Sequence, residues 1–423
     1  SYEVYYPGKN GSQDRVTISA NQTQTEPNTT AHFGASGDCG IAKATRNATS
    51  HEFEFALDHK AAYLVFKPYT SNDVLKYCYL TKIEVTSDND IASTSTYTLD
   101  PTADTGAGAL TGTGNGKQIV LTTKGNYGST YQNGFPLTNT SASLTTNGAY
   151  MVIKPGTHTL RIRYWVKDVA TQIEGTITKI IPSHTFAKNE YVNMEADLQI
   201  KNYDGDHYYM WDAQEQYWKG HEWWSANKDQ PVLNLRSNSN YPQNNSDPRY
   251  WNESYPGYGV SNPATHTPCK DLPNANEMSW YCKFGDPRWD ADELWTAMGH
   301  LYKGGMWFKK KSVLLAEHHY DTEKSADGTT DLRTTYKVYS NSNSGSINSG
   351  VPSAADAGKY FYLPALGYYY SGQLNSVGDV GFYWSSSASS RDYYNAYRLY
   401  FESARINMFV NSRYHGARAE AFQ

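Results

Sequence analysis

The sequence carries little charge and no excess of basic side chains. Asp, Glu, Lys and Arg make up 19% of the 423 residues, and the formal net charge is −5. Because nucleic-acid binding depends on neutralising phosphates, this balance argues against a nucleic-acid partner. Long hydrophobic runs are also missing, and none approaches the roughly 20 residues of a membrane-spanning helix. No signal peptide is recognisable at Ser1, so for an exported protein we expect this to be a processed form.

Cysteine is scarce. The four cysteines are Cys39, Cys78, Cys269 and Cys282. None of them forms a Cys-x-x-Cys pair, so a structural zinc site is not expected. The even number is compatible with two disulfides, Cys269 with Cys282 around the start of one helix and Cys39 with Cys78 in the first half. It is equally compatible with four buried thiols.

Signatures of catalysis and metal binding are also missing. There is no Gly-x-Ser-x-Gly elbow, His-Glu-x-x-His helix or phosphate-binding loop. His318 and His319 are neighbours, and neighbouring strand residues point to opposite faces, so they do not form a convincing metal pair. The run 204–206 lacks the later ligands of a calcium loop and predicts an ordinary turn. We therefore expect no enzyme, no metal and no cofactor. A glycan-acting enzyme stays as the weaker alternative, because the separation of paired carboxylates is spatial.

Aromatic and small polar residues are abundant instead. The chain has 37 Tyr, 11 Trp and 13 Phe, with Ser, Thr, Asn and Gly supplying most of the polar surface. This composition is typical of extracellular β-rich proteins with long loops. Only Trp165 precedes Trp211, so the two parts of the chain should have different cores. We predict two domains, 1–202 and 203–423.

The first domain shows the period of two that is typical of half-buried strands. Apolar side chains alternate with polar ones in 51–57, in 79–85 and in 160–166, where Arg161 and Arg163 form the polar face. The continuous apolar run 61–66 predicts a central strand. With frequent turn signals and no convincing helix before about residue 200, these strands predict a β-sandwich.

The second domain mixes helices and short strands. Asn274 and Glu277 form a capping-box pattern that opens a helix over 275–284. A second helix is predicted over 290–303, where Asp290 caps the start and Gly304-Gly305 ends it. Strands are predicted from the patterns that follow, in 305–311, 382–387, 396–402, 406–410 and 417–422. Two helices followed by antiparallel strands indicate an α+β domain.

Two loops of the second domain are the best binding candidates. Aromatic rings stack on sugars and form hot spots in protein interfaces. In each loop the alternative is that the rings only hold the loop to its own domain. The predicted ligand-binding residues are Tyr250, Trp251, Tyr255 and Tyr258 in the first loop, and Arg391 and Tyr393 in the second.

Several long segments carry a resemblance to a known family. The segments "DHKAAYLVFKPY" (58–69), "YLTKIEVTSDNDIASTSTYTL" (79–99) and "MVIKPGTHTLRIRYWVKD" (151–168) resemble the bacterial fimbrillin-like family of pilus subunits and surface adhesins. The later segments resemble the C-terminal C-type-lectin-like domain of some members. They are "YYMWDAQEQYWKGHEWW" (208–224), "NEMSWYCKFGDPRWD" (276–290), "LWTAMGHLYKGGMWFKKKS" (294–312) and "YFYLPALGYYYSGQLNSVGDVGFYWSSS" (360–387).

The resemblance implies a mainly β chain, with an N-terminal fimbrillin-like β-sandwich and a C-terminal α+β C-type-lectin-like domain. In lectin-like folds a strand tryptophan packs beneath the ligand-bearing loops, a role that would fall to Trp384. Calcium-dependent sugar binding in such folds uses a Trp-Asn-Asp run. Ser385 and Ser386 stand where Asn and Asp would be, and two hydroxyls supply no charge for a cation that prefers six to eight oxygens. We therefore expect ligand binding to be independent of calcium.

The same resemblance implies an exported protein of the cell surface and outer membrane that functions in adhesion. Related pilins assemble by strand donation, so we expect partner pilin subunits, with the N-terminal domain as acceptor and residues 15–23 as the strand to be displaced or processed. The tail 414–423 reads as the last strand of its own domain, with Ala417, Ala419 and Ala421 facing inward. An acceptor without a donor strand would be a tip subunit that recognises a glycan or protein ligand. A free surface glycan-binding protein is the alternative.

Overall fold

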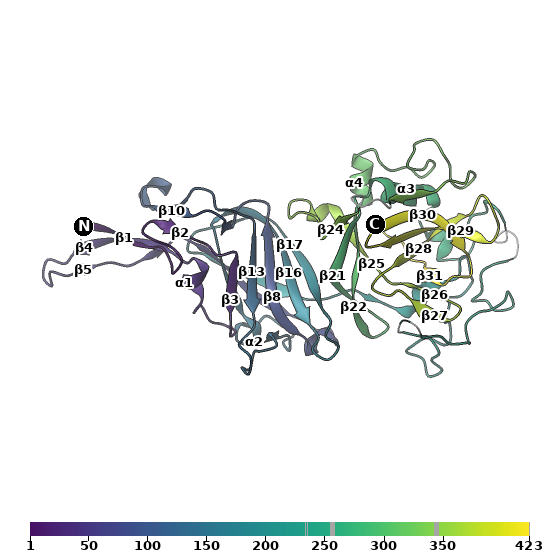
Figure 1. Cartoon of the computed structure of the whole chain (residues 1–423), viewed down its shortest axis with the longest axis horizontal. Helices are drawn as coiled ribbons and strands as arrows, with labels where there is room; N and C mark the ends of the chain where they lie inside the picture. The colour runs from purple at the N-terminus through teal and green to yellow at the C-terminus, as the bar shows by residue number, and fades with distance from the viewer. Residues whose placement is uncertain (233, 235, 254–258, 342–346, 423) are drawn as a thin grey trace. The chain divides into compact units, whose positions relative to one another are not determined.

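A computed structural model describes residues 1–232, 234, 236–253, 259–341 and 347–422 (Figure 1). The chain forms two compact units. Unit 1 comprises Ser1–Ile200 and Ser353–Ala357, and unit 2 comprises Lys201–Pro352 and Gly358–Gln423. The sequence-based division at residue 203 stays a prediction about domains, and the compact units divide after Ile200.

The described part of the chain is mainly β, which confirms the predicted fold class. Helical segments are few and short, and the longest is α3 (Ala275–Phe284). Of the described helices, none is both long and apolar enough to cross a bilayer. The others are α1 (Phe33–Ser36), α2 (Leu144–Asn147), α4 (Lys311–Ala316) and the 3-10 turns η1 (Leu75–Tyr77), η2 (Asp104–Gly106), η3 (Gly205–His207), η4 (Cys269–Asp271) and η5 (Ala357–Lys359).

Unit 1 is built around two sheets whose strands are well separated in sequence. The larger has the order β17 (Glu174–Phe186), β16 (Gly156–Lys167), β8 (Tyr79–Ser87), β13 (Gln118–Thr123) and β3 (Asn21–Gln24), with β14 (Phe135–Pro136) also on β8. The smaller has the order β15 (Ala149–Ile153), β7 (Ala62–Tyr69) and β18 (Tyr191–Asp197). Three small sheets complete the unit. The first contains β1 (Tyr2–Tyr6), β4 (Gly40–Arg46), β5 (Phe53–Glu54) and β6 (Asp58–His59), and the second contains β11 (Ala109–Thr111), β10 (Tyr97–Asp100) and β2 (Arg15–Val16). The third pairs β12 (Asn115–Gly116) with β9 (Ala92–Ser93).

The core of unit 1 lies between these two sheets. Phe66 of β7 meets Tyr164 of β16 with ring centroids 6.1 Å apart, and both side chains are buried. β7 pairs antiparallel with β15 on one side and parallel with β18 on the other. The prediction of a central strand over 61–66 is therefore confirmed, as are the strands over 79–85 and 160–166.

Two predictions about exposure in unit 1 are wrong. Phe53, Phe55 and Leu57 are all exposed, because β5 has only two residues and pairs with the end of β4. Alternation shows which side chains share a face, but it does not show whether another layer covers that face. The second wrong prediction concerns Arg161 and Arg163. The sequence assigns them to the polar face of β16 because they alternate with its apolar side chains, but both are buried.

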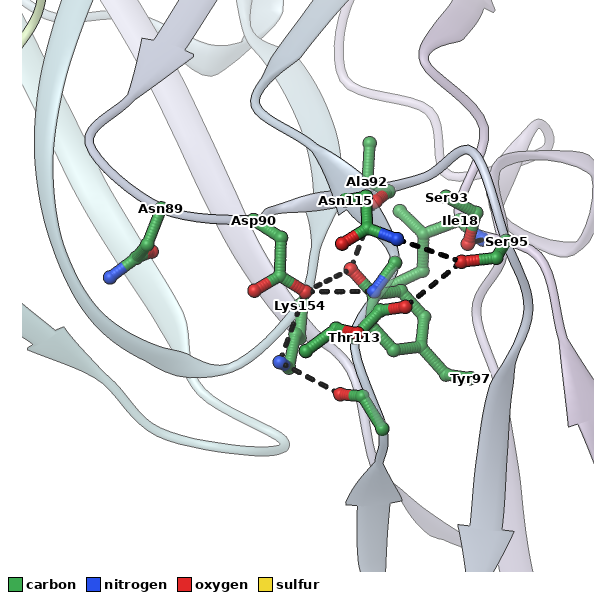
Figure 2. Close-up of polar contacts among 12 residues, drawn as sticks. Ile18, Asn89, Asp90, Ala92, Ser93, Ser95, Tyr97, Thr113, Asn115 and Lys154 are labelled. Atoms are coloured by element: carbon green, nitrogen blue, oxygen red, sulfur yellow. Dashed lines mark hydrogen bonds and ion pairs between the residues drawn. The ribbon is translucent and has the colours of Figure 1, made fainter.

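A partly buried carboxylate joins the loops at one end of unit 1 (Figure 2). Asp90 Oδ2 accepts hydrogen bonds from the Tyr97 hydroxyl (2.9 Å), the Gly114 amide (3.0 Å) and Lys154 Nζ (3.1 Å). Burial alone would raise the pKa of Asp90, but the hydrogen bonds from Gly114, Lys154 and Tyr97 outweigh it and lower the pKa. The ionised carboxylate thus fixes the segments around β9, β10 and β12 to the start of β16.

Strand β3 is held to unit 1 by its side chains as well as by its backbone. It pairs parallel with β13, and it is the last strand in the order of its sheet. The side-chain amides of Gln22 and Gln24 bond the backbone of β15 and of the preceding Gly148. They donate to Val152 O (2.7 Å) and Gly148 O (2.9 Å), and they accept from the Val152 and Tyr150 amides. The segment predicted as the displaced strand, 15–23, therefore contributes buried side chains to unit 1.

Unit 2 contains two main sheets and a small hairpin. The first sheet has the order β25 (Tyr360–Pro364), β22 (His300–Lys309) and β21 (Arg288–Ala297), with β19 (Asn202–Tyr203) and β24 (Asn348–Ser349) also on β21. The second has the order β20 (Tyr208–Tyr209), β31 (Ala417–Arg418), β28 (Gly381–Ala388), β29 (Asn395–Glu402), β30 (Arg405–Ser412) and β23 (Tyr339–Asn341). The hairpin pairs β26 (Tyr368–Tyr370) with β27 (Gln373–Asn375).

Helix α3 begins where the sequence predicts it. The Asn274 side chain accepts from the Glu277 amide (3.0 Å), and the Glu277 carboxylate accepts from the Asn274 amide (2.8 Å). The capping box is therefore confirmed. The helix buries Met278, Tyr281 and Cys282 in the main core of unit 2.

The prediction of a second helix over 290–303 is wrong. Residues 288–309 form the antiparallel hairpin of β21 and β22, which turns at Met298 and Gly299. Both turn residues have positive φ (50° and 76°), as required by a two-residue turn that matches the twist of the strands. Asp290, the predicted cap, is buried in the hairpin and accepts from Trp307 Nε1 (3.0 Å). Pairing of this hairpin with β25 and β19 outweighs its local helical pattern.

The run "FYWSSS" lies in strand β28, and its adjacent large aromatic residues are accommodated because both faces of this strand are covered. Tyr383 belongs to one hydrophobic cluster and Trp384 to the other. The Tyr383 hydroxyl donates to Pro364 O (2.7 Å), and Trp384 Nε1 donates to Tyr209 O (2.8 Å). Ser385 is also buried and donates to Tyr397 O (2.9 Å). The interpretation of Trp384 as a core residue is confirmed.

The end of the chain departs from its prediction at one position. Ala417 and Ala419 are buried, as predicted, whereas Ala421, three residues beyond the end of β31 at Arg418, is exposed. The predicted inward face is therefore two alanines long.

All four cysteines are free and buried. The two disulfides considered from the sequence are therefore absent, and the alternative of four buried thiols is correct. Burial raises the pKa of Cys78 and of Cys269 to about 12 each. Because the thiolate is the reactive form, these side chains behave as small core residues.

Candidate functional site

The candidate site in unit 2 has a buried arginine at its base. Arg413, directly after β30, is 0% exposed. Its guanidinium carbon lies 4.5 Å from the ring centroid of Trp211 and 5.7 Å from that of Trp251. Nη2 donates to Gly259 O (2.7 Å) and Nε donates to Asn395 O (3.2 Å). One side chain therefore ties together two loops that are more than a hundred residues apart in sequence.

The charge of Arg413 is compensated locally. Burial lowers the pKa of Arg413 to about 10, and the carboxylates of Asp212 and Asp392 oppose this shift. The guanidinium therefore stays protonated at neutral pH. Buried charges persist when rings, carbonyls and opposite charges replace water, and all three are present here.

Partly exposed aromatic rings lie around this base. The exposed fractions of Tyr370, Tyr394 and Tyr414 are 45%, 52% and 38%. The rings of Tyr370 and Tyr414 each stack on His415 with centroids 5.0 Å apart. The ring centroids of Tyr393 and Tyr394 lie 4.0 Å apart. We call this surface the aromatic band, and it consists of Tyr250, Tyr370, Tyr393, Tyr394, Tyr414 and His415.

The segment that follows β30 connects the two halves of the band. The Arg413 amide donates to Tyr394 O (2.9 Å), so Tyr414 and His415 follow directly after the residue paired with Tyr394. Burial lowers the pKa of His415, and its ring is therefore neutral near pH 7. A neutral imidazole in contact with two tyrosines gives a surface that is apolar on its faces and polar at its edges.

The structure brings the two predicted binding loops together. Trp251 and Tyr394 have ring centroids 6.5 Å apart, and Tyr250 lies beside Trp251 at 5.9 Å. Tyr250 is half-buried, and burial raises its pKa. Trp251 is only 3% exposed, so it forms part of the base and offers no face to a ligand. The predicted residues Tyr255 and Tyr258 lie outside the described residues.

The second predicted loop contributes both an arginine and a tyrosine. Arg391 is exposed, and its guanidinium carbon lies 5.3 Å from the Tyr336 ring. The Tyr393 hydroxyl donates to the Tyr394 hydroxyl (2.8 Å). The sequence did not point to Tyr370, Tyr414 or His415. A usable signal was present, because the runs 368–372 and 413–416 both place aromatics beside a turn glycine.

A small cavity lies beside Ser386 and Ser387. It has a volume of about 280 Å³ and is lined by Ser261, Pro263, Asn274, Arg333 and the segment 386–388. No carboxylate is in this lining. The Ser387 hydroxyl already accepts from the Ala275 amide (3.0 Å). Across the described ranges, no three His, Cys, Asp or Glu side chains are grouped to hold a metal ion.

No family model matches the chain, and the search of curated proteins found no match. Part of the chain is similar to solved structures of proteins provisionally assigned to cell adhesion. One is from Bacteroides ovatus, with 12% identity, a TM-score of 0.26 and coverage of 46% of this chain and 62% of that one. Another is from Bacteroides uniformis, with 14% identity, a TM-score of 0.27 and coverage of 46% and 66%.

The match spans less than two thirds of each of these proteins. At such low TM-scores the likeness carries no argument about fold or function. The functional interpretation therefore depends on the chain's own residues.

Proposed function

We propose that this chain is an exported adhesion protein of the cell surface and outer membrane, and that unit 2 recognises its ligand through the aromatic band. The observation that supports this most strongly is the group of three exposed tyrosines over a rigid buried base. Exposed aromatic groups of this kind are uncommon on monomers and mark interaction sites. Their faces stack on sugar rings, while their hydroxyls bond to sugar hydroxyls. We propose a glycan as the ligand, bound without turnover.

The proposed recognition does not use calcium. The cavity beside Ser386 and Ser387 presents hydroxyl, amide and guanidinium groups, whereas a calcium site needs several charged or carbonyl oxygens. The band itself consists of five tyrosines and one histidine and contains no acidic side chain. Stacking on such rings depends on apolar contact and on hydrogen bonds, and neither requires a cation.

A glycan array probed with the full chain tests this proposal. We expect saturable binding to a subset of glycans, with equal signals in EDTA and in calcium. Binding that is lost in EDTA and restored by calcium would refute the calcium-independent mechanism. If the chain binds no glycan but does bind a protein, then the ligand of unit 2 is a protein and the glycan proposal is wrong.

The finer part of the proposal is that the chain is a pilus subunit. Its support is the position of β3, which pairs with β13 at the end of its sheet, so that an incoming strand could take its place. Unit 1 would then accept a strand from a neighbouring pilin, and unit 2 would face outward at the tip. In immunogold labelling of intact cells we expect this protein at fibre ends. Regular labelling along the shaft would contradict the tip position, and labelling of the cell surface alone would favour the free glycan-binding protein.

A further inference from the structure

Unit 2 contains a second concave feature that the aromatic band does not use. A cavity of about 460 Å³ lies between residues 223, 228–232 and 236–238 and the turn at 298–300 that joins β21 to β22. Its size falls in the range of about 300–1,000 Å³ that is typical of small-ligand pockets. We call it the Trp223 pocket, and its polar and aromatic lining includes Trp223, Lys228, Asp229, Arg236, Asn238 and His300.

One wall of the Trp223 pocket is a fixed aromatic ring. Trp223 is half-buried and packs against the main core of unit 2. A Cβ atom at Gly299 would lie 3.0 Å from Trp223 Cζ3, so the ring lies directly against the turn backbone. The neighbouring Gln230 is buried, and its Nε2 donates to Gly205 O (3.1 Å) while its Oε1 accepts from the Trp223 amide (3.1 Å). The pocket therefore has a rigid apolar wall of the kind that stacks on the C–H face of a sugar ring.

A second wall carries an oriented carboxylate. Asp229 accepts hydrogen bonds from Asn240 Nδ2 (2.8 Å), Asn238 Nδ2 (3.1 Å) and His221 Nδ1 (2.9 Å). The hydrogen bonds from Asn240 and Asn238 lower the pKa of Asp229, so it is an acceptor at neutral pH. A carboxylate has about four acceptor positions, and the side chain of Asp229 is still 32% exposed. It can therefore accept from a ligand hydroxyl without losing its own partners.

The rim of the pocket is cationic. Lys228 and Arg236 both line it and both are exposed. Within the described ranges, neither of them forms an ion pair with an acidic side chain. The lining contains a lysine and an arginine against the single carboxylate of Asp229, so its formal charge is positive. Arginine in particular recognises carboxylates through two parallel hydrogen bonds.

We propose that the Trp223 pocket binds a carboxylated sugar. The apolar ring face stacks on Trp223, ring hydroxyls bond to Asp229 and Asn238, and the sugar carboxylate is held by Lys228 and Arg236. A neutral sugar of the same shape lacks the ionic contact, and a simple carboxylic acid lacks the stacking surface. This inference does not depend on the aromatic band, because it concerns different residues and a ligand that the band does not require.

Titration calorimetry with the full chain tests it directly. The probes are sodium glucuronate, sodium galacturonate and N-acetylneuraminate, and glucose and galactose are the neutral controls. We expect at least one acidic sugar to bind at least tenfold more tightly than the neutral sugars, and its affinity should fall with added salt. No binding of any acidic sugar, or equal binding of the neutral sugars, overturns the proposal.

Variants separate this pocket from the rest of unit 2. The double variant Lys228→Ala/Arg236→Ala changes only exposed side chains, so it should keep the wild-type melting temperature and lose at least tenfold in affinity for the acidic sugar. Asp229→Asn should also weaken binding of the acidic sugar, because the ring hydroxyls lose a charged acceptor while Lys228 and Arg236 still bind the sugar carboxylate. The matched control is Tyr127→Ala in unit 1, which removes a fully exposed tyrosine and should bind the acidic sugar as the wild type does. Loss of acidic-sugar binding in Tyr394→Ala, with no loss in the double variant, would assign the binding to the aromatic band instead.

Discussion

Trp384→Ala should lower the free energy of unfolding of unit 2 by about 3–5 kcal/mol. The side chain is 0% exposed and packs edge-to-face on Phe382, with ring centroids 5.2 Å apart. Removing it creates a cavity in the cluster that also contains Trp211. It also leaves Tyr209 O without the indole donor that now lies at 2.8 Å. Both effects act in the same direction, so the loss should be among the largest of any single substitution in this unit.

Urea denaturation followed by tryptophan fluorescence measures this effect. Ten of the eleven tryptophans lie at or after Trp211, so the signal reports mainly on unit 2. Trp224→Ala is the matched control, because Trp224 is 50% exposed and should change the stability by no more than about 0.5 kcal/mol. Equal midpoints for the two variants would show that Trp384 is not part of a packed core.

Arg413→Ala should destabilise unit 2 by about 2–4 kcal/mol, because two partly buried carbonyls lose a charged donor and two indole rings lose a cation. The carbonyls belong to Gly259 and Asn395, which the guanidinium now joins. The variant should therefore also loosen the loops of the aromatic band and weaken ligand binding by about tenfold, which corresponds to 1.4 kcal/mol.

Two comparisons make the Arg413 result interpretable. Arg413→Lys keeps the charge but lacks the planar fork, so it should retain only part of the stability. Arg46→Ala, an exposed position in unit 1, should leave both stability and binding unchanged. If Arg413→Ala binds with wild-type affinity, the arginine stabilises the fold without organising the recognition surface.

Local signals were sufficient for elements whose fold agrees with their local pattern. The capping box of Asn274 and Glu277 defined the start of α3 because both hydrogen bonds form within one turn. The apolar run at 61–66 identified a central strand because both faces of β7 are covered. Long-range pairing decided the other cases. The segment 288–305 carries a helical pattern, yet it forms a hairpin between two partner strands that no local window contains.

The candidate site was predictable only in part for the same reason. Tyr250, Tyr393 and Arg391 could be chosen because they lie in loops rich in turn-forming residues. The burial of Trp251 could not be foreseen, since it depends on Arg413, which is 162 positions away in the numbering. Tyr370 and Tyr414 were missed because their partner is His415, and their stacking depends on how the β26–β27 hairpin meets the end of β30.

The most direct test of the central claim compares ligand affinity in the variant Tyr394→Ala/Tyr414→Ala with that of the wild-type chain. The ligand is the glycan with the strongest signal on the array, and biolayer interferometry gives the dissociation constant. Both side chains are well exposed, so the melting temperature should change little. The control is Tyr127→Ala, which removes a fully exposed tyrosine from unit 1. We predict that the double variant loses at least tenfold in affinity while the control binds normally. Wild-type affinity in the double variant would contradict recognition through the aromatic band.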